Sequence, residues 1–308
     1  MQLTTHKKAK QMHQFKINLP KKLIRGIINL MHTSVFLGAH MGTVKTLNKL
    51  KQSCVFENMY CQVEEAVKNC DLCLRRNKVS NIYPKLRESI FPDHPFHIWS
   101  MDTTGKLQLC ANGDQYIIIA VEHFTKYTVI APAKDLRSKS VMEFIIKEII
   151  SHFGNMDFLL SDNATCFTSK TFNEMAKELG FKIIHSSPRN PQSNGLAENR
   201  VKCVKRILTH YHDEIHRGNW SEFLPFIQLA LNTSIDASRK YTPFFLLHGF
   251  EAKSVFDNIV SNPREGFCSE DEWVSNLVQE VFVSQQICVN ELKKGPKRSS
   301  GRIQQKNI

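Results

Sequence analysis

Two histidines and two cysteines near the start of the chain have the types and spacing of metal ligands. They form the pattern His32-x7-His40, then 29 residues, then Cys70-x2-Cys73. Imidazole and thiolate ligands suit Zn²⁺, which binds four of them tetrahedrally, and a Cys-x2-Cys turn lets two sulfurs face one ion. Because side chains fill all four positions, we predict a structural zinc site. The alternative is four unconnected residues in a chain that has 13 His and 9 Cys.

The segment around these ligands, residues 20–76, is predicted to be a small all-helical domain. Apolar residues recur at helical spacing in three places, the first of which begins with Leu23 and Ile24. The apolar core is thin for so short a segment, so a bound metal would help to stabilise it. Cys54 and Cys61 lie nearby without a paired spacing, and we expect both to be small core residues.

Three carboxylates further along the chain lie where distant segments can converge. Asp102 falls within a predicted strand, Asp162 ends a short apolar strand, and Glu198 lies in the first turn of a long predicted helix. Thirty-five residues separate Asp162 from Glu198. Three carboxylates at one point repel one another unless cations hold them, and their oxygens suit Mg²⁺ or Mn²⁺. Two such ions can clamp the attacking and leaving oxygens of a phosphodiester displacement.

Each of these acids also has a purely structural explanation when it is taken alone. Asp102 could cap a turn, Asp162 could form an Asx turn, and Glu198 could interact with the helix dipole. Only the three acids together indicate a metal-dependent site.

The segment that must bring the acids together, residues 96–251, has the pattern of an α/β domain with a mixed sheet. Three strands with short turns come first, and helices then alternate with strands. The predicted strands cover residues 96–107, 115–122, 127–132, 157–161 and 181–185. The predicted helices cover residues 138–153, 169–179, 196–215 and 220–231.

Shifts in composition divide the whole chain into further predicted segments. A basic N-terminal arm precedes the zinc-binding domain, a proline-rich linker follows it, and a second linker, a helix and a basic disordered tail follow the α/β domain. These segments are the arm at 1–19, the linkers at 77–95 and 252–269, the C-terminal helix at 270–292 and the tail at 293–308.

The net charge points to a polyanionic partner. The chain has 41 Lys+Arg and 29 Asp+Glu, a net charge of +12. Residues 1–100 hold 16 basic and 6 acidic residues, a net of +10, whereas residues 101–200 hold 11 of each. Such a basic segment most often binds nucleic acid. The alternative is a basic soluble protein with no such partner. No apolar run approaches 18 residues, so we expect no membrane span, and nine cysteines without disulfide spacing indicate reduced thiols.

Four motifs in order resemble the integrases of long-terminal-repeat retrotransposons, most closely the Gypsy type. The first two are the His-His-Cys-Cys pattern, including Cys70-Asp71-Leu72-Cys73, and the three spaced acids. The third, at residues 190–198, reads Asn-Pro-Gln-Ser-Asn-Gly-Leu-Ala-Glu and is similar to the family's His-Pro-Gln-Ser-Asp/Asn-Gly-x-x-Glu. The fourth, at residues 241–249, is similar to its Thr-Pro-Phe-x-Leu-x-x-Gly segment. The resemblance covers about His32 to Glu251.

The resemblance implies a ribonuclease-H-like integrase catalytic core, with a mixed five-stranded sheet and helices, preceded by a zinc-binding domain. It implies that Asp102, Asp162 and Glu198 are catalytic and bind two magnesium or manganese ions. The family's chemistry is hydrolysis at a DNA 3′ end, followed by attack of that 3′-hydroxyl on target DNA. DNA would therefore be the partner, a homo-oligomer the working form and the nucleus the location. A small-molecule substrate is not expected.

The helix that bears Glu198 also carries residues suited to binding DNA. Lys202 and Lys205 follow Glu198 at i+4 and i+7, so they share its face of the helix and can hold phosphates beside the acids. The alternative is an exposed and solvated helix face. The full set of candidates for DNA contact is Lys202, Lys205, Arg206, Arg189 and Gln192.

Three functions remain open from the sequence. The first is an active, metal-dependent polynucleotidyl transferase, and the intact set of acids favours it. The second is a DNA- or chromatin-binding protein that keeps the fold without catalysis. Asn163-Ala164-Thr165 in place of the family's Gln/Asn-Gly-Thr, and the lack of an expected folded module after Leu292, favour this one. The third is an interaction scaffold that oligomerises through the zinc-binding domain and the helix around Trp273.

Overall fold

A computed structural model describes residues 16–76, 92, 94–186, 195–210, 220–235 and 240–253. The predicted C-terminal helix and tail lie outside the described residues, as do residues 1–15 of the predicted arm and most of both linkers. Two candidates for DNA contact, Arg189 and Gln192, also lie outside them. None of the helices that the structure describes is long and apolar enough to cross a membrane.

The first domain is helical, with one small addition to the prediction. Its core contains Ile24, Ile28 and Met31 on one face, whereas Leu23 is 54% exposed. Two residues from the predicted arm form strand β1, which pairs in parallel with β2 and places Ile17 opposite Cys54. The elements are β1 (Ile17–Asn18), α1 (Lys21–Thr33), α2 (Thr43–Ser53), β2 (Cys54–Val55), α3 (Met59–Lys68) and α4 (Asp71–Arg76).

The second domain is built on the mixed five-stranded sheet that was expected. The strand order is β5-β4-β3-β6-β7, in which β3, β4 and β5 are antiparallel neighbours and β3, β6 and β7 run parallel. Strand β3 ends earlier than predicted, at Thr103, and just beyond it the Thr104 hydroxyl accepts the Ile117 N–H. The strands are β3 (Ile98–Thr103), β4 (Tyr116–Glu122), β5 (Thr128–Ala133), β6 (Phe158–Ser161) and β7 (Lys182–His185).

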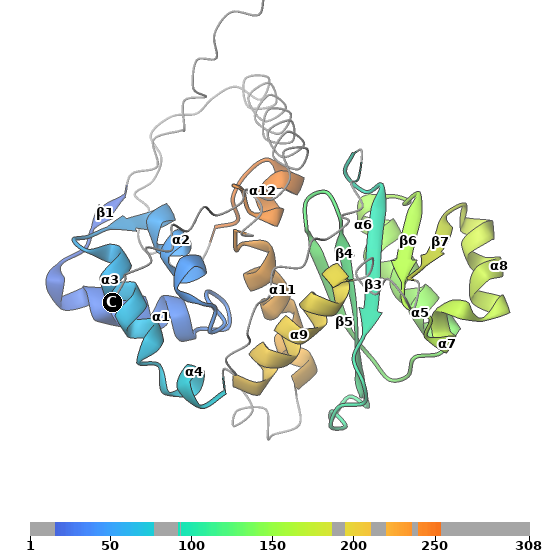
Figure 1. The fold of residues 1–308 in the computed structure, drawn as a ribbon, viewed down its shortest axis with the longest axis horizontal. Coiled ribbons are helices and arrows are strands. Elements are labelled where there is room, and N and C mark those ends of the chain that lie inside the picture. The colour runs from blue at the N-terminus through green and yellow to red at the C-terminus, as the bar shows by residue number, and fades with distance from the viewer. Residues whose placement is uncertain are drawn as a thin grey trace, which may run out of the picture.

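Helices cover both faces of this sheet, as the alternation of side chains along β4 requires. Ile117 and Ile119 lie in the cluster with α9 and α11, whereas Ile118 and Ala120 lie in the cluster with α5 and α8. Figure 1 shows the two helical layers on opposite sides of the sheet. The helices on one face are α5 (Ser138–Phe144), α6 (Ser151–Phe153), α7 (Thr165–Thr168) and α8 (Lys170–Leu179), and those on the other are α9 (Gly195–His210) and α11 (Leu224–Asn232).

The helix predicted over residues 138–153 is continuous but not uniform, since Ile145–Ile150 has π-helical turns between α5 and α6. A short helix that the sequence pattern did not predict, α12 (Pro243–His248), begins at Thr242, whose hydroxyl accepts the Phe245 N–H. A 3-10 turn, Trp220–Phe223, leads into α11. The described part of the predicted 196–215 helix ends at His210.

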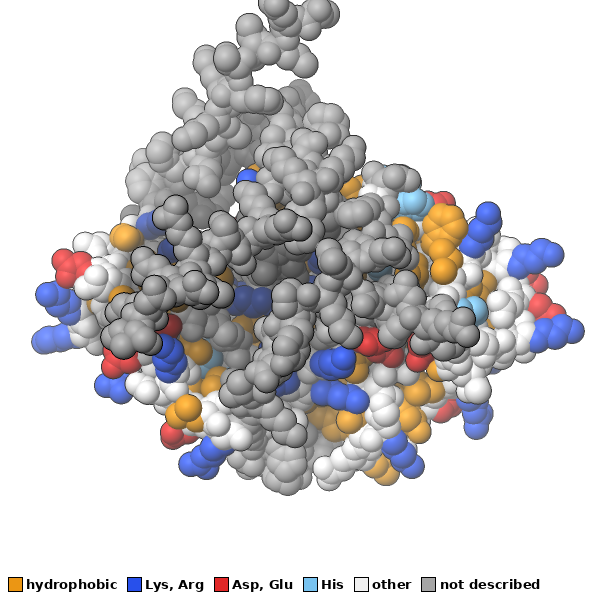
Figure 2. All heavy atoms as spheres, in the orientation of Figure 1, with side chains coloured by type: hydrophobic (Ala, Val, Ile, Leu, Met, Phe, Trp, Pro, Cys, Tyr) orange, Lys and Arg blue, Asp and Glu red, His pale blue; other side chains and the backbone are white. Residues whose placement is uncertain are grey.

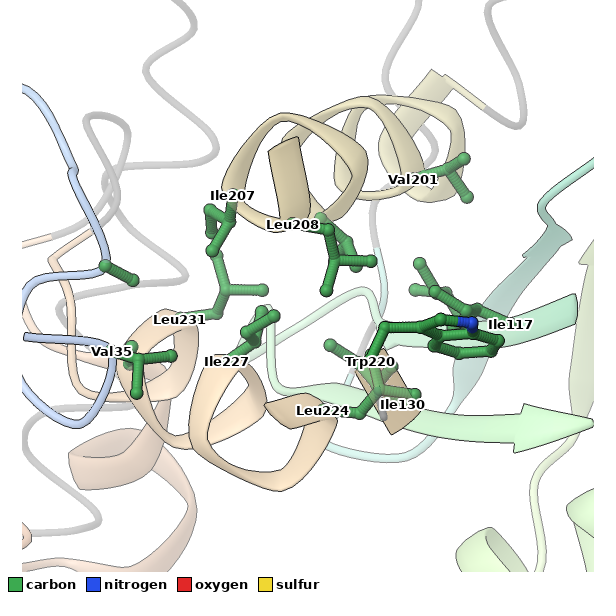
Figure 3. Close-up of a cluster of buried hydrophobic side chains, with 14 of the residues drawn as sticks. Val35, Ile117, Ile130, Val201, Ile207, Leu208, Trp220, Leu224, Ile227 and Leu231 are labelled. Carbon is green, nitrogen blue, oxygen red and sulfur yellow. The ribbon is translucent and has the colours of Figure 1, made fainter. Parts of the chain in front are cut away.

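The two domains pack against each other. Figure 1 shows α9 and α11 between the helices of the first domain and the sheet. Val35, Ala39 and Met41 of the first domain are buried in the same apolar cluster as Ile207 and Leu231. Figure 3 shows Val35 beside Ile227 and Leu231 of α11. The domains therefore share one core at this boundary.

Candidate metal centre and acidic site

The four predicted zinc ligands form a compact group at the edge of the first domain. One ligand atom from each of His32, His40, Cys70 and Cys73 lies within 4.8 Å of the others. Cys73 Sγ is 3.3 Å from His32 Nε2 and 3.6 Å from His40 Nδ1, and Cys70 Sγ is 3.5 Å from His40 Nδ1. A tetrahedral Zn²⁺ with ordinary bond lengths separates its sulfur and nitrogen ligands by about 3.5 Å. The group therefore fits zinc.

The protonation of His32 also suits a metal ligand. Its Nδ1 donates to the Met41 carbonyl oxygen at 3.1 Å, which leaves Nε2 to face the cysteines. Metal-binding histidines are commonly oriented by such a bond from the second ring nitrogen. Burial lowers the pKa of His32, and a charge on His210 acts in the same direction, although the Met41 bond opposes them. The neutral imidazole, which is the form that binds a metal, is therefore favoured.

A tight loop between α1 and α2 places His40 in this group. Ala39 and His40 have φ values of 45° and 53°, a left-handed conformation that is unusual for residues with a side chain. At Gly38, an added Cβ would lie 1.9 Å from the Met31 carbonyl oxygen, so only glycine fits there.

The two other cysteines of the first domain, Cys54 and Cys61, differ in burial. Cys54 is buried, as predicted, and burial raises its pKa to about 11.

The prediction that Cys61 is a core residue is wrong, because its side chain is exposed. Helix α3 turns Val63 into the core, with 0% exposure, and position 61 falls on the solvent side of the helix. Helix α3 has few apolar residues, so its sequence alone did not predict which of its faces is buried.

The acidic residues approach one another where β3 and β6 run side by side. The parallel register pairs Ser100 with Leu160, and continuing it by two residues leads to Asp102 and Asp162. Helix α9 packs against β3 and β4 and carries Glu198 in its first turn.

The charges of Asp162 and Glu198 both act on the carboxyl group of Asp102. The pKa of Asp102 is raised to about 6, first by burial and then by the negative charges of Asp162 and Glu198. The Thr103 N–H, which donates to Asp102 Oδ1 at 2.7 Å, and the charge of Lys205 oppose this shift. Acids in such a group are stabilised by bound cations.

The acidic group is more open than the His/Cys group. Over the described ranges, only the two histidines and two cysteines bring three or more ligand atoms within 4.8 Å of one another. A site for two ions about 3.5–4 Å apart also needs more widely spread ligands than a site for one zinc ion. Asp162 Oδ1 accepts the Ala164 N–H at 3.1 Å, so the Asx turn that was the alternative for this residue is present.

Two residues beside the acids were not singled out from the sequence. Cys166 is buried, and its pKa is raised by burial and by the charges of Asp162 and Asp102. His185 Nδ1 lies 3.2 Å from Ser161 Oγ and 3.4 Å from the Asp162 carbonyl oxygen. The only sequence signal for His185 is its place at the end of a predicted strand, because β7 is the parallel neighbour of β6.

The basic residues of α9 lie on its exposed surface next to the acids. Lys202 Nζ is 3.9 Å from Glu198 Oε2, and the charge of Lys205 acts on Asp102. The Lys202 side chain is 73% exposed, so this ion pair adds little to folding stability. Arg206 is also exposed. In Figure 2, acidic and basic side chains are interspersed over the visible described surface, with no large patch of one sign.

Comparisons with protein families identify both domains. Residues 19–79 match the model of the integrase zinc binding domain, and residues 92–191 match that of the integrase core domain. The Pro-Pol polyprotein of Simian foamy virus type 3 (strain LK3) is 29% identical over 221 residues, which are 71% of this chain and 19% of that protein. The Retrovirus-related Pol polyprotein from transposon 412 of Drosophila melanogaster is 25% identical over 223 residues, 72% of this chain and 18% of that protein.

A further relative and two solved structures are also similar to this chain. The Transposon Tf2-3 polyprotein of Schizosaccharomyces pombe is 25% identical over 231 residues, which are 74% of this chain. The chain thus spans less than a fifth of the length of these polyproteins. Among solved structures, the catalytic core domain of BIV integrase aligns with 48% of this chain and 91% of its own, at a TM-score of 0.40 and 25% identity. A simian T-cell lymphotropic virus intasome aligns with 75% of this chain and 77% of its own, at a TM-score of 0.48 and 18% identity. The chain therefore contains a segment that matches an integrase zinc binding domain, followed by a segment that matches an integrase core domain.

Proposed function

We propose that this protein processes DNA 3′ ends and transfers them into target DNA, using two divalent ions held by Asp102, Asp162 and Glu198. The observation that carries the proposal is the meeting of β3, β6 and the first turn of α9, which brings Asp162 and Glu198 near enough to Asp102 for both charges to raise its pKa. Acidic groups that act on one another at the meeting point of two strands and a helix are characteristic of functional sites.

Each side chain has a definite task in this proposal. The three carboxylates hold Mg²⁺ or Mn²⁺, which when bound supply the charge that activates the attacking oxygen and stabilises the leaving one. Lys202 and Lys205 bind phosphate groups of the DNA beside the acids, where they fix its position without reading its sequence. Arg206 extends the same surface. Arg189 and Gln192 are proposed as further DNA contacts.

The zinc centre has a structural task. We propose that His32, His40, Cys70 and Cys73 bind one Zn²⁺, supported by the match between their separations and those of a tetrahedral site. The integrase family acts on DNA, and we propose that this chain works in the nucleus as a homo-oligomer. We further propose that it is a domesticated copy of a retrotransposon integrase.

A second function remains in competition with the first, namely binding of nucleic acid or chromatin without catalysis. Its support is the ion pair between Lys202 and Glu198, together with the open spacing of the acids. In this function the acids would be retained without holding the two ions.

Strand transfer by the purified protein separates the two functions. We expect the wild-type protein to join a labelled DNA end to a plasmid when Mn²⁺ or Mg²⁺ is present, and Asp162→Asn to reduce the product at least about 100-fold, because one carboxylate ligand is lost. Glu178→Gln, an exposed acid on α8, is the matched control. Binding of both proteins to duplex DNA is measured in parallel, and its affinity should fall steeply with salt. Equal product from wild type and Asp162→Asn would leave only the non-catalytic function.

A further inference from the structure

The loop that carries the proposed zinc ligand His40 is also part of the surface through which the first domain contacts the second. We call residues 34–41, between α1 and α2, the ligand loop. Its residues Val35, Ala39 and Met41 are all buried, and they lie in the apolar cluster of α9 and α11. Figure 3 shows Val35 pointing at the α11 side chains. The ligand loop therefore contributes His40 to the proposed metal site and Val35, Ala39 and Met41 to the domain interface.

Met41 connects the two sites through its main chain and its side chain. Its carbonyl oxygen accepts hydrogen bonds from His32 Nδ1 and from Thr46 Oγ1, both at 3.1 Å. Its sulfur lies 3.0 Å from Ser234 Oγ, just beyond the end of α11. A shift of Met41 would thus disturb a metal ligand and a core contact together.

The ligand His40 reaches the end of the helix that carries Glu198. Its ring stacks on the ring of His210, with a centroid separation of 5.0 Å and an angle of 18° between the planes. His210 is the last described residue of α9, and its Nδ1 donates to the Arg206 carbonyl oxygen at 2.6 Å. The zinc centre therefore abuts one end of α9, and the acidic site lies at the other.

A buried lysine joins the ligand loop to α11. Lys49 of α2 is 8% exposed, and its Nζ donates to the Leu37 carbonyl oxygen of the ligand loop. The same Nζ donates to Thr233 Oγ1 at 2.9 Å and lies 3.5 Å from the Ala230 carbonyl oxygen. These groups lie at the C-terminal end of α11, where main-chain carbonyls lack helical partners and a positive charge is favourable.

We propose that zinc binding and docking of the first domain onto the core are one coupled equilibrium, so that zinc loading fixes α9 from the end opposite Glu198. Zinc holds His40 in its left-handed conformation and keeps the ligand loop in the shape that fits α9 and α11. Lys49 is a positioning residue that ties this loop to α11. The inference rests on the proposed zinc site but not on the proposed catalytic activity.

Coupling of this kind is reciprocal, which makes it measurable far from the metal. If docking stabilises the zinc-binding shape of the loop, then a change on the core side must weaken zinc binding, although it touches no ligand. We expect the zinc dissociation constant of the full chain to rise about 5- to 20-fold in Lys49→Met and in Thr233→Val. The two substitutions remove the donor and the acceptor of the same hydrogen bond.

The test is a competition titration of zinc against a coloured chelator. Lys51→Met, an exposed lysine on the same helix, and Thr209→Val, an exposed threonine of α9, are the matched controls and should bind zinc as the wild type does. Lys49→Met together with Thr233→Val should weaken binding no more than Lys49→Met alone. Zinc binding of equal affinity in the wild type and both interface variants would overturn the coupling and leave the zinc site intact. A wild-type protein that binds no zinc would overturn both.

Hydrogen exchange of the wild-type chain provides a second measurement that needs no variant. Removal of zinc should raise the exchange rates of α9 and α11 by about 10-fold or more and leave α8, on the far face of the sheet, unchanged. Exchange in α9 and α11 that does not respond to zinc would overturn the proposal even if Lys49→Met fails to fold.

Discussion

At the scale of single residues, the ionised acidic site lowers the free energy of unfolding. Asp102 is partly buried, and in the folded protein its pKa is about 6, against 3.8 for the free side chain. Above pH 6 the folded chain must therefore carry a charge that burial and two neighbouring acids disfavour. Functional sites commonly lower stability in this way, because their groups are arranged for a ligand rather than for the fold.

Replacing Asp102 by asparagine should therefore stabilise the zinc-loaded protein when no Mg²⁺ is present. The pKa is raised on folding, so the unfolded chain ionises first, and the wild type loses stability as the pH rises from about 4 to 6. At pH 7 we expect Asp102→Asn to be more stable by about 1–2 kcal/mol, after allowance for the partial exposure of the group. Urea unfolding at intervals between pH 7 and 5 measures this difference, which should shrink as the pH falls. Equal midpoints at pH 7 would contradict it.

The sequence predicted which His and Cys residues come together better than it predicted their surroundings. Spacing and residue type were enough to select the four His/Cys residues that the structure brings together. They could not place Cys61, whose exposure depends on how α3 turns, or His185, whose place beside Asp162 follows from the order of the strands. Such neighbours become visible only when the sheet topology is known.

At the scale of elements, the protein protects an exposed sheet edge with side chains from α11. Strand β5 is the last strand on its side of the sheet, and unpaired edges favour aggregation. Asn232 Oδ1 accepts the Thr128 N–H and its Nδ2 donates to the Thr128 carbonyl oxygen, both at 2.8 Å. Gln228 Oε1 accepts the Ile130 N–H at 2.7 Å. The side chains of α11 thus substitute for a neighbouring strand.

The strands and longer helices were predictable because their apolar periodicity matches their two-sided burial. The edge protection by α11 was not, since it depends on two amide side chains that meet a strand about 100 residues away. The same holds for α12, which is short and begins from a single cap at Thr242. Local apolar periodicity predicts where an element lies along the chain. Which strand a polar side chain hydrogen-bonds depends on contacts between residues that are distant in sequence.

Asn232→Ala should destabilise the protein by about 2–4 kcal/mol. Asn232 is 1% exposed, and its loss leaves both main-chain groups of Thr128 without these partners in a buried place. Asn173→Ala, an exposed asparagine of α8 that also bonds to main-chain carbonyls, is the control and should change stability by less than about 1 kcal/mol. The midpoint and slope of urea unfolding measure both. A small effect of Asn232→Ala would show that water replaces the amide.

At the scale of the whole molecule, the positive charge is not gathered on the acidic site. Residues 1–100 carry a net of +10, and the residues that contain the three acids are neutral overall. Part of the basic excess lies in the interior, because Lys49 is buried where the two domains meet. Net charge therefore agrees with the class of partner that we propose, but it is a poor guide to which lysines would contact that partner.

Lys49 should make the stability of the molecule depend on pH. Burial lowers its pKa from 10.5 to about 7, and Lys45 acts in the same direction, although Glu251 opposes them. Above pH 7 the folded chain has released this proton while the unfolded chain still holds it, so stability should rise with pH. Below about pH 7 both states hold the proton and the slope should vanish. Between pH 7 and 9 we expect a gain of about 2 kcal/mol relative to Lys49→Met.

The upper limit of pH 9 keeps Cys54 out of the measurement, because its raised pKa lowers stability only above the ordinary thiol value of 9.0. Urea unfolding of the zinc-loaded proteins at intervals between pH 6 and 9 gives the two curves, and Lys51→Met should follow the wild type. Parallel curves for wild type and Lys49→Met would mean that Lys49 stays charged in the folded protein. Its ammonium group would then be held by the three oxygens around it strongly enough to offset its burial.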